Sequence, residues 1–144
     1  MAIFVALDVG TKTIGVARAE AIRGQASPWT TVRPRKGLKK DIPRLLEVVR
    51  AEEVEAWIVG LPIEKDGTEG RAVRLARQVG DAIGAASGRP VFYQDETLSS
   101  KEAAMRLYEV GYGDRRLRPV IDQAAAAIIL QRWLEAGGRH PQEG

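Results

Sequence analysis

The sequence predicts an α/β protein built on a mixed five-stranded sheet, with strand order 3-2-1-4-5 and helices on both faces. Three observations predict this class. Three strand-like segments follow one another through short connections, which favours an antiparallel meander. Two later strand-like segments each follow a helical segment, and such crossovers favour parallel pairing. The first segment has apolar residues on both faces, so we expect it at the centre of the sheet.

The strand segments are short apolar runs bounded by turn residues. The first contains the run 3–7, and Gly10 permits a tight connection to the second. Pro28 at the start of the third is typical of an edge strand. The predicted strands are residues 2–9, 13–19, 28–33, 56–60 and 91–94.

Apolar residues at helical spacing predict the first two helices. We expect Pro43 in the first turn of the first helix, because proline breaks a helix further along. Ser99 and Glu102 form a capping box that starts a third helix. Pro119 favours the first position of the last helix, after a flexible basic loop. The predicted helices are residues 38–49, 69–86, a segment from 99 and residues 119–137, and the loop is residues 111–118.

The composition is that of a globular protein, with 144 residues and 44% hydrophobic residues. We expect one domain over residues 1–138 and a disordered tail over residues 139–144. The absence of cysteine excludes disulfides and Cys-ligated zinc, and fits a reducing cytoplasm. We find neither a signal peptide nor an apolar run of about 18 residues, so we expect a cytoplasmic protein without a membrane partner. The net charge of +3 permits an anionic partner.

Three acidic residues follow or adjoin predicted secondary structure at matching places. Asp8 ends the central strand, Glu96 follows the fifth strand, and Asp122 lies near the start of the last helix. The carboxyl ends of parallel strands form the crevice where α/β proteins bind ligands, so we expect these carboxylates to meet there. Hard oxygen ligands suit Mg²⁺ or Mn²⁺. Two such ions, about 3.5–4 Å apart, would activate water and stabilise a leaving oxygen.

Each acid alone also has a simpler explanation. Asp8 could bond the Gly10 and Thr11 amides as a turn residue. Glu96 could be a solvated loop acid, with Asp95 as the ligand instead. Asp122 could be a negative charge favoured near a helix N-terminus.

Further candidates for substrate binding lie in two connections. Thr11 and Lys12, beside Asp8, could contact a phosphate, or Lys12 could only offset the local acids. In the basic loop, arginines could bind phosphates and a tyrosine could stack on an unpaired base, or the loop could be a solvated connection. Those loop residues are Tyr112, Arg115, Arg116 and Arg118.

Several pieces in the same order along the chain resemble the YqgF family, also called RuvX, of the RNase H-like superfamily. They are Leu7-Asp8-Val9-Gly10-Thr11-Lys12-Thr13-Ile14-Gly15-Val16-Ala17, Val59-Gly60-Leu61-Pro62, Asp66-Gly67-Thr68-Glu69-Gly70, Asp95-Glu96-Thr97-Leu98-Ser99-Ser100, and Asp122-Gln123-Ala124-Ala125 ahead of Ile128-Ile129-Leu130. The resemblance implies an RNase H-like fold and makes Asp8, Glu96 and Asp122 the metal-binding catalytic acids. Two residues depart from the pattern. Thr97 stands where the family commonly has arginine, and Ala125 stands where RuvC-type resolvases carry another acid.

The resemblance implies a hydrolase, a divalent-metal-dependent nuclease that cuts phosphodiester bonds in RNA. The expected role is 5′-end processing of pre-16S rRNA in ribosome biogenesis, with ribosomal precursor particles as partners and a monomer or weak homodimer as the active form. One alternative is a Holliday junction resolvase or other structure-specific DNA nuclease, which would require a dimer. Another is a non-catalytic RNA-binding ribosome-assembly factor. A sugar-kinase or Hsp70-like ATPase shares the hairpin after Asp8, but those proteins need two such domains.

Overall fold

The computed structural model describes residues 3–10, 12–20, 24–34, 37–63, 66–96 and 114–137, with residues 114–119 described by their backbone only. The predicted start of a helix at Ser99 and the predicted tail over residues 139–144 lie outside these ranges. No helix in the described ranges is both long enough and apolar enough to cross a membrane.

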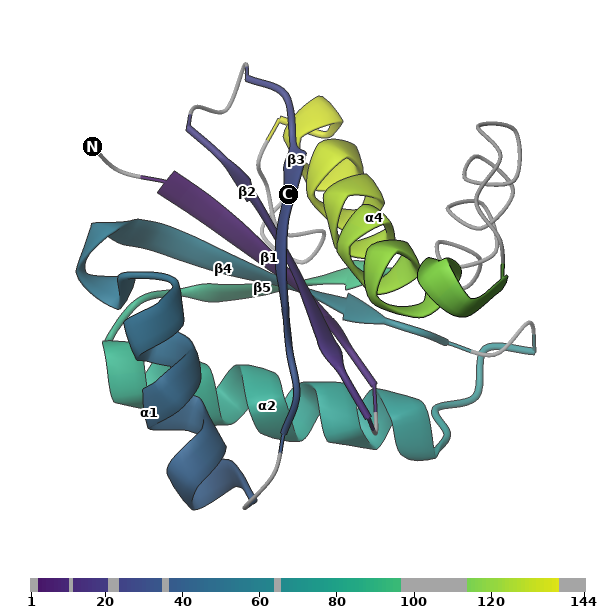
Figure 1. Cartoon of the computed structure of the whole chain (residues 1–144), viewed down its shortest axis with the longest axis horizontal. Helices are drawn as coiled ribbons and strands as arrows, with labels where there is room; N and C mark the ends of the chain where they lie inside the picture. The colour runs from purple at the N-terminus through teal and green to yellow at the C-terminus, as the bar shows by residue number, and fades with distance from the viewer. Residues whose placement is uncertain are drawn as a thin grey trace.

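Five strands form one sheet in the order β3-β2-β1-β4-β5, as the sequence predicts (Figure 1). β1 is central, antiparallel to β2 and parallel to β4. β3 pairs with β2 antiparallel, and β5 pairs with β4 parallel. The carboxyl ends of β1, β4 and β5 therefore lie at one end of the sheet. The strand bounds are β1 Ile3–Val9, β2 Ile14–Ala19, β3 Ser27–Val32, β4 Val54–Leu61 and β5 Val91–Asp95.

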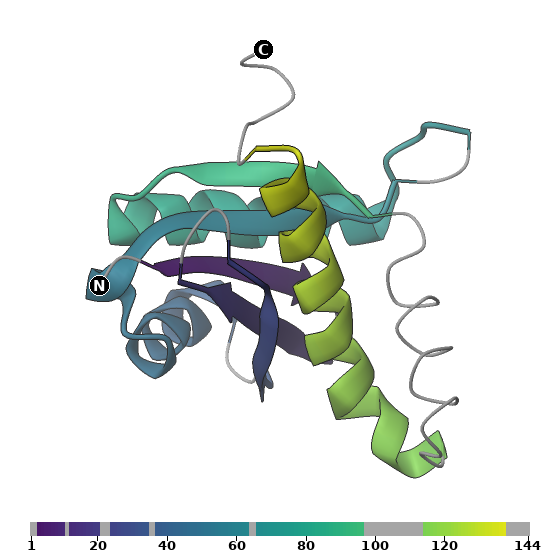
Figure 2. The ribbon, with the colours of Figure 1, turned by 90° about the horizontal axis from the view of Figure 1, so that it is seen from above.

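Helices cover both faces of the sheet. α1 and α2 lie on one face, while α4 crosses the other and contacts all five strands (Figures 1 and 2). α2 packs on β1 and β4, and α1 packs beside α2. The helix bounds are α1 Leu38–Val48, α2 Arg71–Ser87 and α4 Asp114–Glu135, with a short 3₁₀ turn η1 at Ala51–Glu53 before β4.

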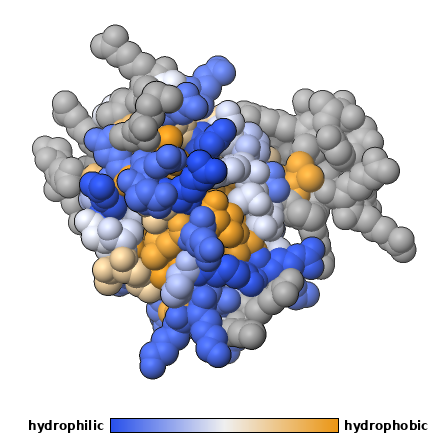
Figure 3. All heavy atoms as spheres, turned by 60° about the vertical axis from the view of Figure 1, so that its left-hand side comes forward, coloured by the Kyte–Doolittle hydropathy of each residue, from blue (hydrophilic) through white to orange (hydrophobic). Residues whose placement is uncertain are grey.

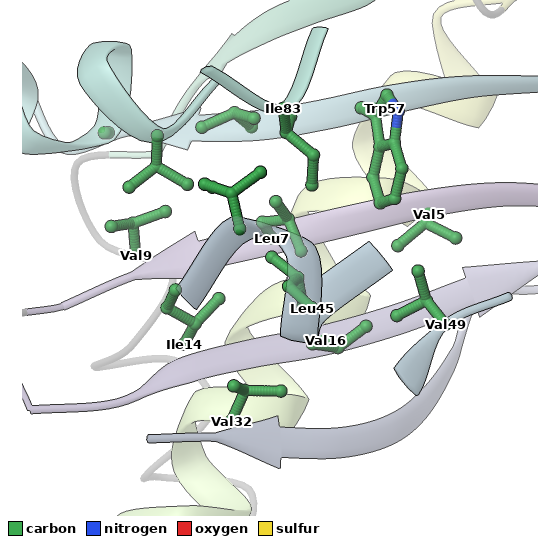
Figure 4. Close-up of a cluster of buried hydrophobic side chains, with 14 of the residues drawn as sticks. Val5, Leu7, Val9, Ile14, Val16, Val32, Leu45, Val49, Trp57 and Ile83 are labelled. Atoms are coloured by element: carbon green, nitrogen blue, oxygen red, sulfur yellow. The ribbon is translucent and has the colours of Figure 1, made fainter. Parts of the chain in front are cut away.

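Each face of the sheet has its own apolar core. Val5, Leu7 and Val9 of β1 face α1 and α2 together with Trp57 (Figure 4). Phe4 and Ala6 of the same strand face α4. Strand residues alternate between the two faces, so β1 supplies both cores. The next residue on the α4 side is Asp8, which places a carboxylate at the edge of that core.

The three tryptophans pack against other residues of the protein. Trp57 is fully buried in the core under α2, and its Nε1 donates to Ser87 Oγ over 2.9 Å. Trp133 of α4 is buried in the other core, with its ring centroid 5.4 Å from that of Phe4. Trp29 on the edge strand is half-buried, and the Arg18 guanidinium lies over its ring.

The placement of Pro43 differs from the prediction. Pro43 is the sixth residue of α1, inside the helix rather than in its first turn, and the helix continues to Val48. Proline cannot donate a hydrogen bond to the carbonyl four residues earlier, which belongs to Lys39. Both residues are exposed, so water can satisfy that carbonyl. Solvent exposure therefore lets α1 tolerate an internal proline.

The start of the last helix also differs from the prediction. α4 begins at Asp114, so residues 114–118 are helical and are not part of a flexible loop. Pro119 is the sixth helical residue and not the first. The prediction treated proline as a boundary marker, but a helix tolerates proline where the lost hydrogen bond can be replaced. As a consequence, Asp122 lies in the third turn of α4.

Candidate active site

Asp8 lies between two glycines on the face of the sheet that α4 covers. In the antiparallel pair its partner on β2 is Gly15. On the other side, Leu7 pairs with Val59 of β4, so Gly60 lies beside Asp8 on the parallel strand. Asp8 is half-buried. The neighbouring strands therefore place no side chain of their own directly beside its carboxylate.

Gly15 allows the backbone of α4 to approach the sheet closely. A Cβ atom at Gly15 would lie 2.0 Å from the carbonyl oxygen of Asp122, which is an impossible contact. Thr13 Oγ1 donates a hydrogen bond to Asp122 Oδ2. A strand residue without a side chain and a neighbouring hydroxyl thus fix Asp122 against β2, beside Asp8.

The electrostatics of Asp8 reflect this arrangement. Burial first, and then the negative charge of Asp122, raise the pKa of Asp8 to about 7. Two carboxylates in one partly desolvated site repel each other, and this disfavours the ionised form. The two predicted acids from β1 and α4 are therefore electrostatically coupled in the structure.

Glu96 directly follows β5. Its backbone N–H donates to the Leu61 carbonyl over 2.9 Å, which extends the pairing with β4. Its side chain is only 2% exposed, and Arg132 Nη1 of α4 lies 3.1 Å from Glu96 Oε2. Asp95, the alternative ligand, is exposed. Burial therefore favours Glu96 over Asp95 as the acid of this site.

Gly60 connects Glu96 to the other two acids. A Cβ atom at Gly60 would lie 3.2 Å from Glu96 Cγ and 2.4 Å from Ile129 Cδ1 of α4. Gly60 also lies beside Asp8 on the sheet. Glu96 and Asp8 thus flank the same glycine, with α4 packed over it.

The chain matches the family described as "RuvX: Holliday junction resolvase" over residues 2–136. The chain belongs to the RuvX family. A relative from Anaeromyxobacter sp. (strain Fw109-5), named "Putative pre-16S rRNA nuclease", is 41% identical to this RuvX chain over 137 residues, which cover 95% of this chain and 98% of the relative. Membership and relatives support a nuclease function.

Solved structures support the RNase H-like fold of this RuvX protein. Thermus thermophilus RuvC has a TM-score of 0.57 and 20% sequence identity, with 94% of this chain and 96% of that chain covered. A Fowlpox virus resolvase in complex with Holliday junction DNA has a TM-score of 0.59 and 11% identity, with 95% and 99% covered. At these identities the likeness shows the fold alone.

The RuvX acids can be tested for their fit to a divalent cation. Asp8 and Asp122 offer oxygen donors, and their mutual repulsion would be relieved by a hard cation between them. Glu96 is paired with Arg132. Within the described ranges, no three Asp, Glu, His or Cys side chains form a group that could hold a metal ion. The structure therefore fits a cation at the Asp8–Asp122 pair, and the role of Glu96 as a ligand stays a prediction.

The remaining predicted contacts are only partly described. Lys12 is exposed in the connection between β1 and β2. Thr11 and Tyr112 lie outside the described residues. Arg115, Arg116 and Arg118 lie in the first turns of α4, and nothing is described of their side chains. Binding of substrate by these residues stays a prediction.

An apolar cavity of about 280 Å³ lies on the other side of the sheet. Its lining includes Val9, Ile14, Ile42 and Val79, which belong to the core under α1 and α2. Asp41 is a carboxylate in this lining, and it occupies the first turn of α1, where the helix dipole favours an acid. This cavity is therefore separate from the Asp8 site.

Four residues that shape the site were not assigned a role from the sequence. Gly15 and Gly60 set the spacing around Asp8, and a glycine inside a strand is a known mark of close backbone approach, so this signal was present. Thr13 and Arg132 contact Asp122 and Glu96. Their roles depend on how α4 packs on the sheet, which no local pattern reveals.

Proposed function

We propose that this RuvX protein is a divalent-cation-dependent nuclease that hydrolyses phosphodiester bonds in RNA. The observation that carries the proposal is the pairing of Asp8 and Asp122 across Gly15, on an RNase H-like sheet, with buried Glu96 at the neighbouring Gly60. Asp8 of β1 lies beside Asp122 of α4, and Glu96 follows β5 at the neighbouring Gly60, at the carboxyl ends of strands where α/β proteins bind ligands.

The residues of the site would have separate roles in binding the cation and in positioning its ligands. Asp8 and Asp122 would hold Mg²⁺ or Mn²⁺ through their carboxylate oxygens, with Glu96 as the candidate ligand of a second ion. Thr13 orients Asp122, and Arg132 holds Glu96 in place. A bound divalent cation supplies Lewis acidity toward the phosphate and lowers the pKa of water. The apolar underside of α4 limits the access of bulk water from the side of the core.

The preferred substrate is a precursor of 16S rRNA, because the relative that matches along nearly its whole length carries that name. Such a protein would act in the cytoplasm on ribosomal precursor particles. A second candidate substrate is a DNA four-way junction, which the family description favours. Ala125, where RuvC-type resolvases carry another acid, is fully buried among apolar residues, and this favours RNA as the first substrate to test.

The test is cleavage by the purified protein with Mg²⁺ or Mn²⁺ titrated, on structured RNA, single-stranded DNA and a four-way junction. Asp8→Asn and Glu96→Gln should each lower the rate by at least about 100-fold, the scale on which one charge-stabilising group acts. Asp95→Asn is the matched control, since this neighbouring acid is exposed, and it should retain cleavage.

Two outcomes would contradict the proposal. If folded Asp8→Asn cleaves at the wild-type rate, Asp8 is not part of the active site. If chelation of divalent cations leaves cleavage unchanged, the reaction does not depend on such a cation. If only the four-way junction is cut, sedimentation with and without the junction should reveal a dimer, as two symmetric incisions require.

A further inference from the structure

The positive charge of this protein is concentrated in one short segment. Residues 33–44 contain six Lys and Arg and a single acid, Asp41, which gives a net charge of +5. The whole chain has a net charge of +3, so the remaining residues together carry −2. A mildly basic total therefore conceals a strongly basic segment on a slightly acidic protein.

The described basic side chains of this region lie at the same end of the sheet as the candidate site. Arg33 directly follows Val32, which pairs with Ile14, which in turn pairs with Val9 next to Asp8. Two strand spacings of about 4.8 Å and two residues of about 3.3 Å put the Cα atoms of Arg33 and Asp8 about 12 Å apart. We define the basic end as Lys12, Arg33, Lys39, Lys40 and Arg44.

The start of α1 adjoins the same end of β1. Gly37 and Leu38 line one cavity together with Gly10 of the β1–β2 connection. Arg44 Nη2 donates to the Arg33 carbonyl, which ties α1 to the end of β3. Figure 3 brings forward the side of the molecule on which α1 lies in Figure 1, where blue hydrophilic residues surround an orange apolar patch. The basic end therefore lies at the same end of the sheet as the Asp8 site, on the side of α1.

These cations are available to a ligand. Lys12, Arg33, Lys39 and Lys40 are exposed, and Arg44 is half-buried. Within the described residues, none of the five takes part in an ion pair. Asp41, the acid of the segment, is buried. Glu52, Glu53 and Glu55 lie beyond the other end of α1, in η1 and at the start of β4.

Helix stability does not explain the two lysines. Lys39 and Lys40 are the second and third residues of α1. The N-terminus of a helix carries a partial positive charge, which disfavours cations by about 0.3–1 kcal/mol each. A sequence selected for stability alone would place acids there. The lysines therefore indicate an anionic ligand.

We propose that the basic end binds the phosphate backbone of the nucleic-acid strand that leaves the Asp8–Asp122 site. This inference rests on the proposed nuclease function and adds the path of its substrate. Exposed Lys and Arg side chains neutralise successive phosphates, and the contacts carry no sequence preference. RNA and DNA share this chemistry.

The test measures binding in EDTA, which prevents cation-dependent cleavage. Fluorescence anisotropy follows labelled single-stranded RNA and DNA of the same sequence between about 50 and 200 mM salt. The test variant is Lys39→Gln with Lys40→Gln. The matched control is Arg50→Gln with Arg89→Gln, which removes the same charge at the amino ends of β4 and β5, away from the site.

The test variant should bind several-fold more weakly at low salt, and the slope of log K against log salt should fall by about 1.4, or about 0.7 for each lost phosphate contact. Its thermal unfolding temperature should not fall, because both lysines oppose the helix dipole. The control should keep the wild-type slope. A loss on both nucleic acids would support contacts to phosphate, and a loss on RNA only would contradict them, because the DNA carries the same phosphates.

The proposal is overturned if the test variant keeps the wild-type slope of log K against log salt, or if the slope of the control falls as much as that of the test variant. These results are distinct from a failure of the proposed function. If the protein cuts no substrate with any divalent cation, yet binds nucleic acid through Lys39 and Lys40, the binding role of the basic end is supported. The proposed nuclease function is then contradicted.

Discussion

At the scale of single residues, the spacing of the candidate site depends on two missing side chains. Gly15 admits the backbone of Asp122, and Gly60 admits Ile129 and Glu96. Both glycines lie on the strands that flank β1 at the level of Asp8. The acids are therefore brought together by packing that only glycine permits, and their own charges oppose that packing.

We expect Gly15→Ala to destabilise the protein and to lower cleavage. The new methyl group would meet the backbone of Asp122, which cannot rotate away, so α4 must shift from the sheet. Overpacking of this kind costs about 1–3 kcal/mol or more. Urea unfolding measures the loss.

Gly84→Ala in α2 is the control for Gly15→Ala. Its methyl group meets Val91 Cγ2 at 2.9 Å, a side-chain atom rather than backbone, and alanine favours a helix by about 1 kcal/mol over glycine. Equal losses from both substitutions would contradict the special role of Gly15.

The raised pKa of Asp8 predicts how stability depends on pH without divalent cations. The pKa rises from 3.8 to about 7 on folding, so between these values the folded protein binds the proton that the unfolded chain releases. The contribution of Asp8 to stability is therefore highest below pH 4 and falls as the pH rises to about 7. Asp8→Asn removes the cost of ionising this carboxylate in the folded protein. Its stability relative to wild type should therefore grow by about 2–4 kcal/mol between pH 4 and pH 8.

Urea unfolding in EDTA at several pH values measures this difference. Asp122→Asn serves as the comparison, because burial is the larger cause of the raised pKa and the charge of Asp122 the smaller. It should remove only part of the pH dependence. A difference between Asp8→Asn and wild type that stays constant with pH would show that Asp8 ionises normally.

At the scale of elements, the strands followed their local sequence more closely than the helices did. All five strands and their order agree with the prediction, because alternation and short connections are local signals. Pro119 misled the start of α4, and Pro43 lies inside α1 rather than in its first turn, since the cost of a proline depends on whether the lost hydrogen bond is replaced. The contact of Arg132 with Glu96 joins residues 36 apart and required the packing of α4.

We expect Pro43→Ala to stabilise the protein. Pro43 is exposed inside α1, so its removal loses little packing and restores a backbone donor to the Lys39 carbonyl. A proline in a helix interior costs up to about 3 kcal/mol relative to alanine, and we expect a gain of about 1–2 kcal/mol. Urea unfolding measures this change.

Pro90→Ala is the comparison for Pro43→Ala, because Pro90 is exposed just before β5 and outside any helix. There, loss of the ring only adds freedom to the unfolded chain, so stability should be unchanged or slightly lower. An equal gain in stability at both positions would show that the gain does not come from removing a proline from the interior of α1.

At the scale of the whole molecule, one sheet separates two cores. Trp57 reports on the core under α2, and Trp133 reports on the core under α4. β1 contributes residues to both, so neither core can lose its packing while the other keeps the strand in place. We therefore expect the chain to unfold as one cooperative unit, which would agree with the single domain predicted from the sequence.

Trp57→Phe and Trp133→Phe variants, each in a background with Trp29→Phe, leave one tryptophan apiece for this test. For each variant, the urea midpoint from fluorescence should coincide with the midpoint from circular dichroism. Separate midpoints within one variant would mean that the two faces unfold independently.

The division of β1 between two cores also bears on protein engineering. Phe4 and Ala6 support α4, and with it the position of Asp122 relative to Asp8, whereas Val5 and Leu7 support the helices on the opposite face. Substitutions at Phe4 and Ala6 would change the position of Asp122 relative to Asp8. Substitutions at Val5 and Leu7 would change the packing under α1 and α2. Because adjacent residues belong to different layers, substitutions at the first pair reach the acids directly, whereas those at the second pair reach them only through the strand.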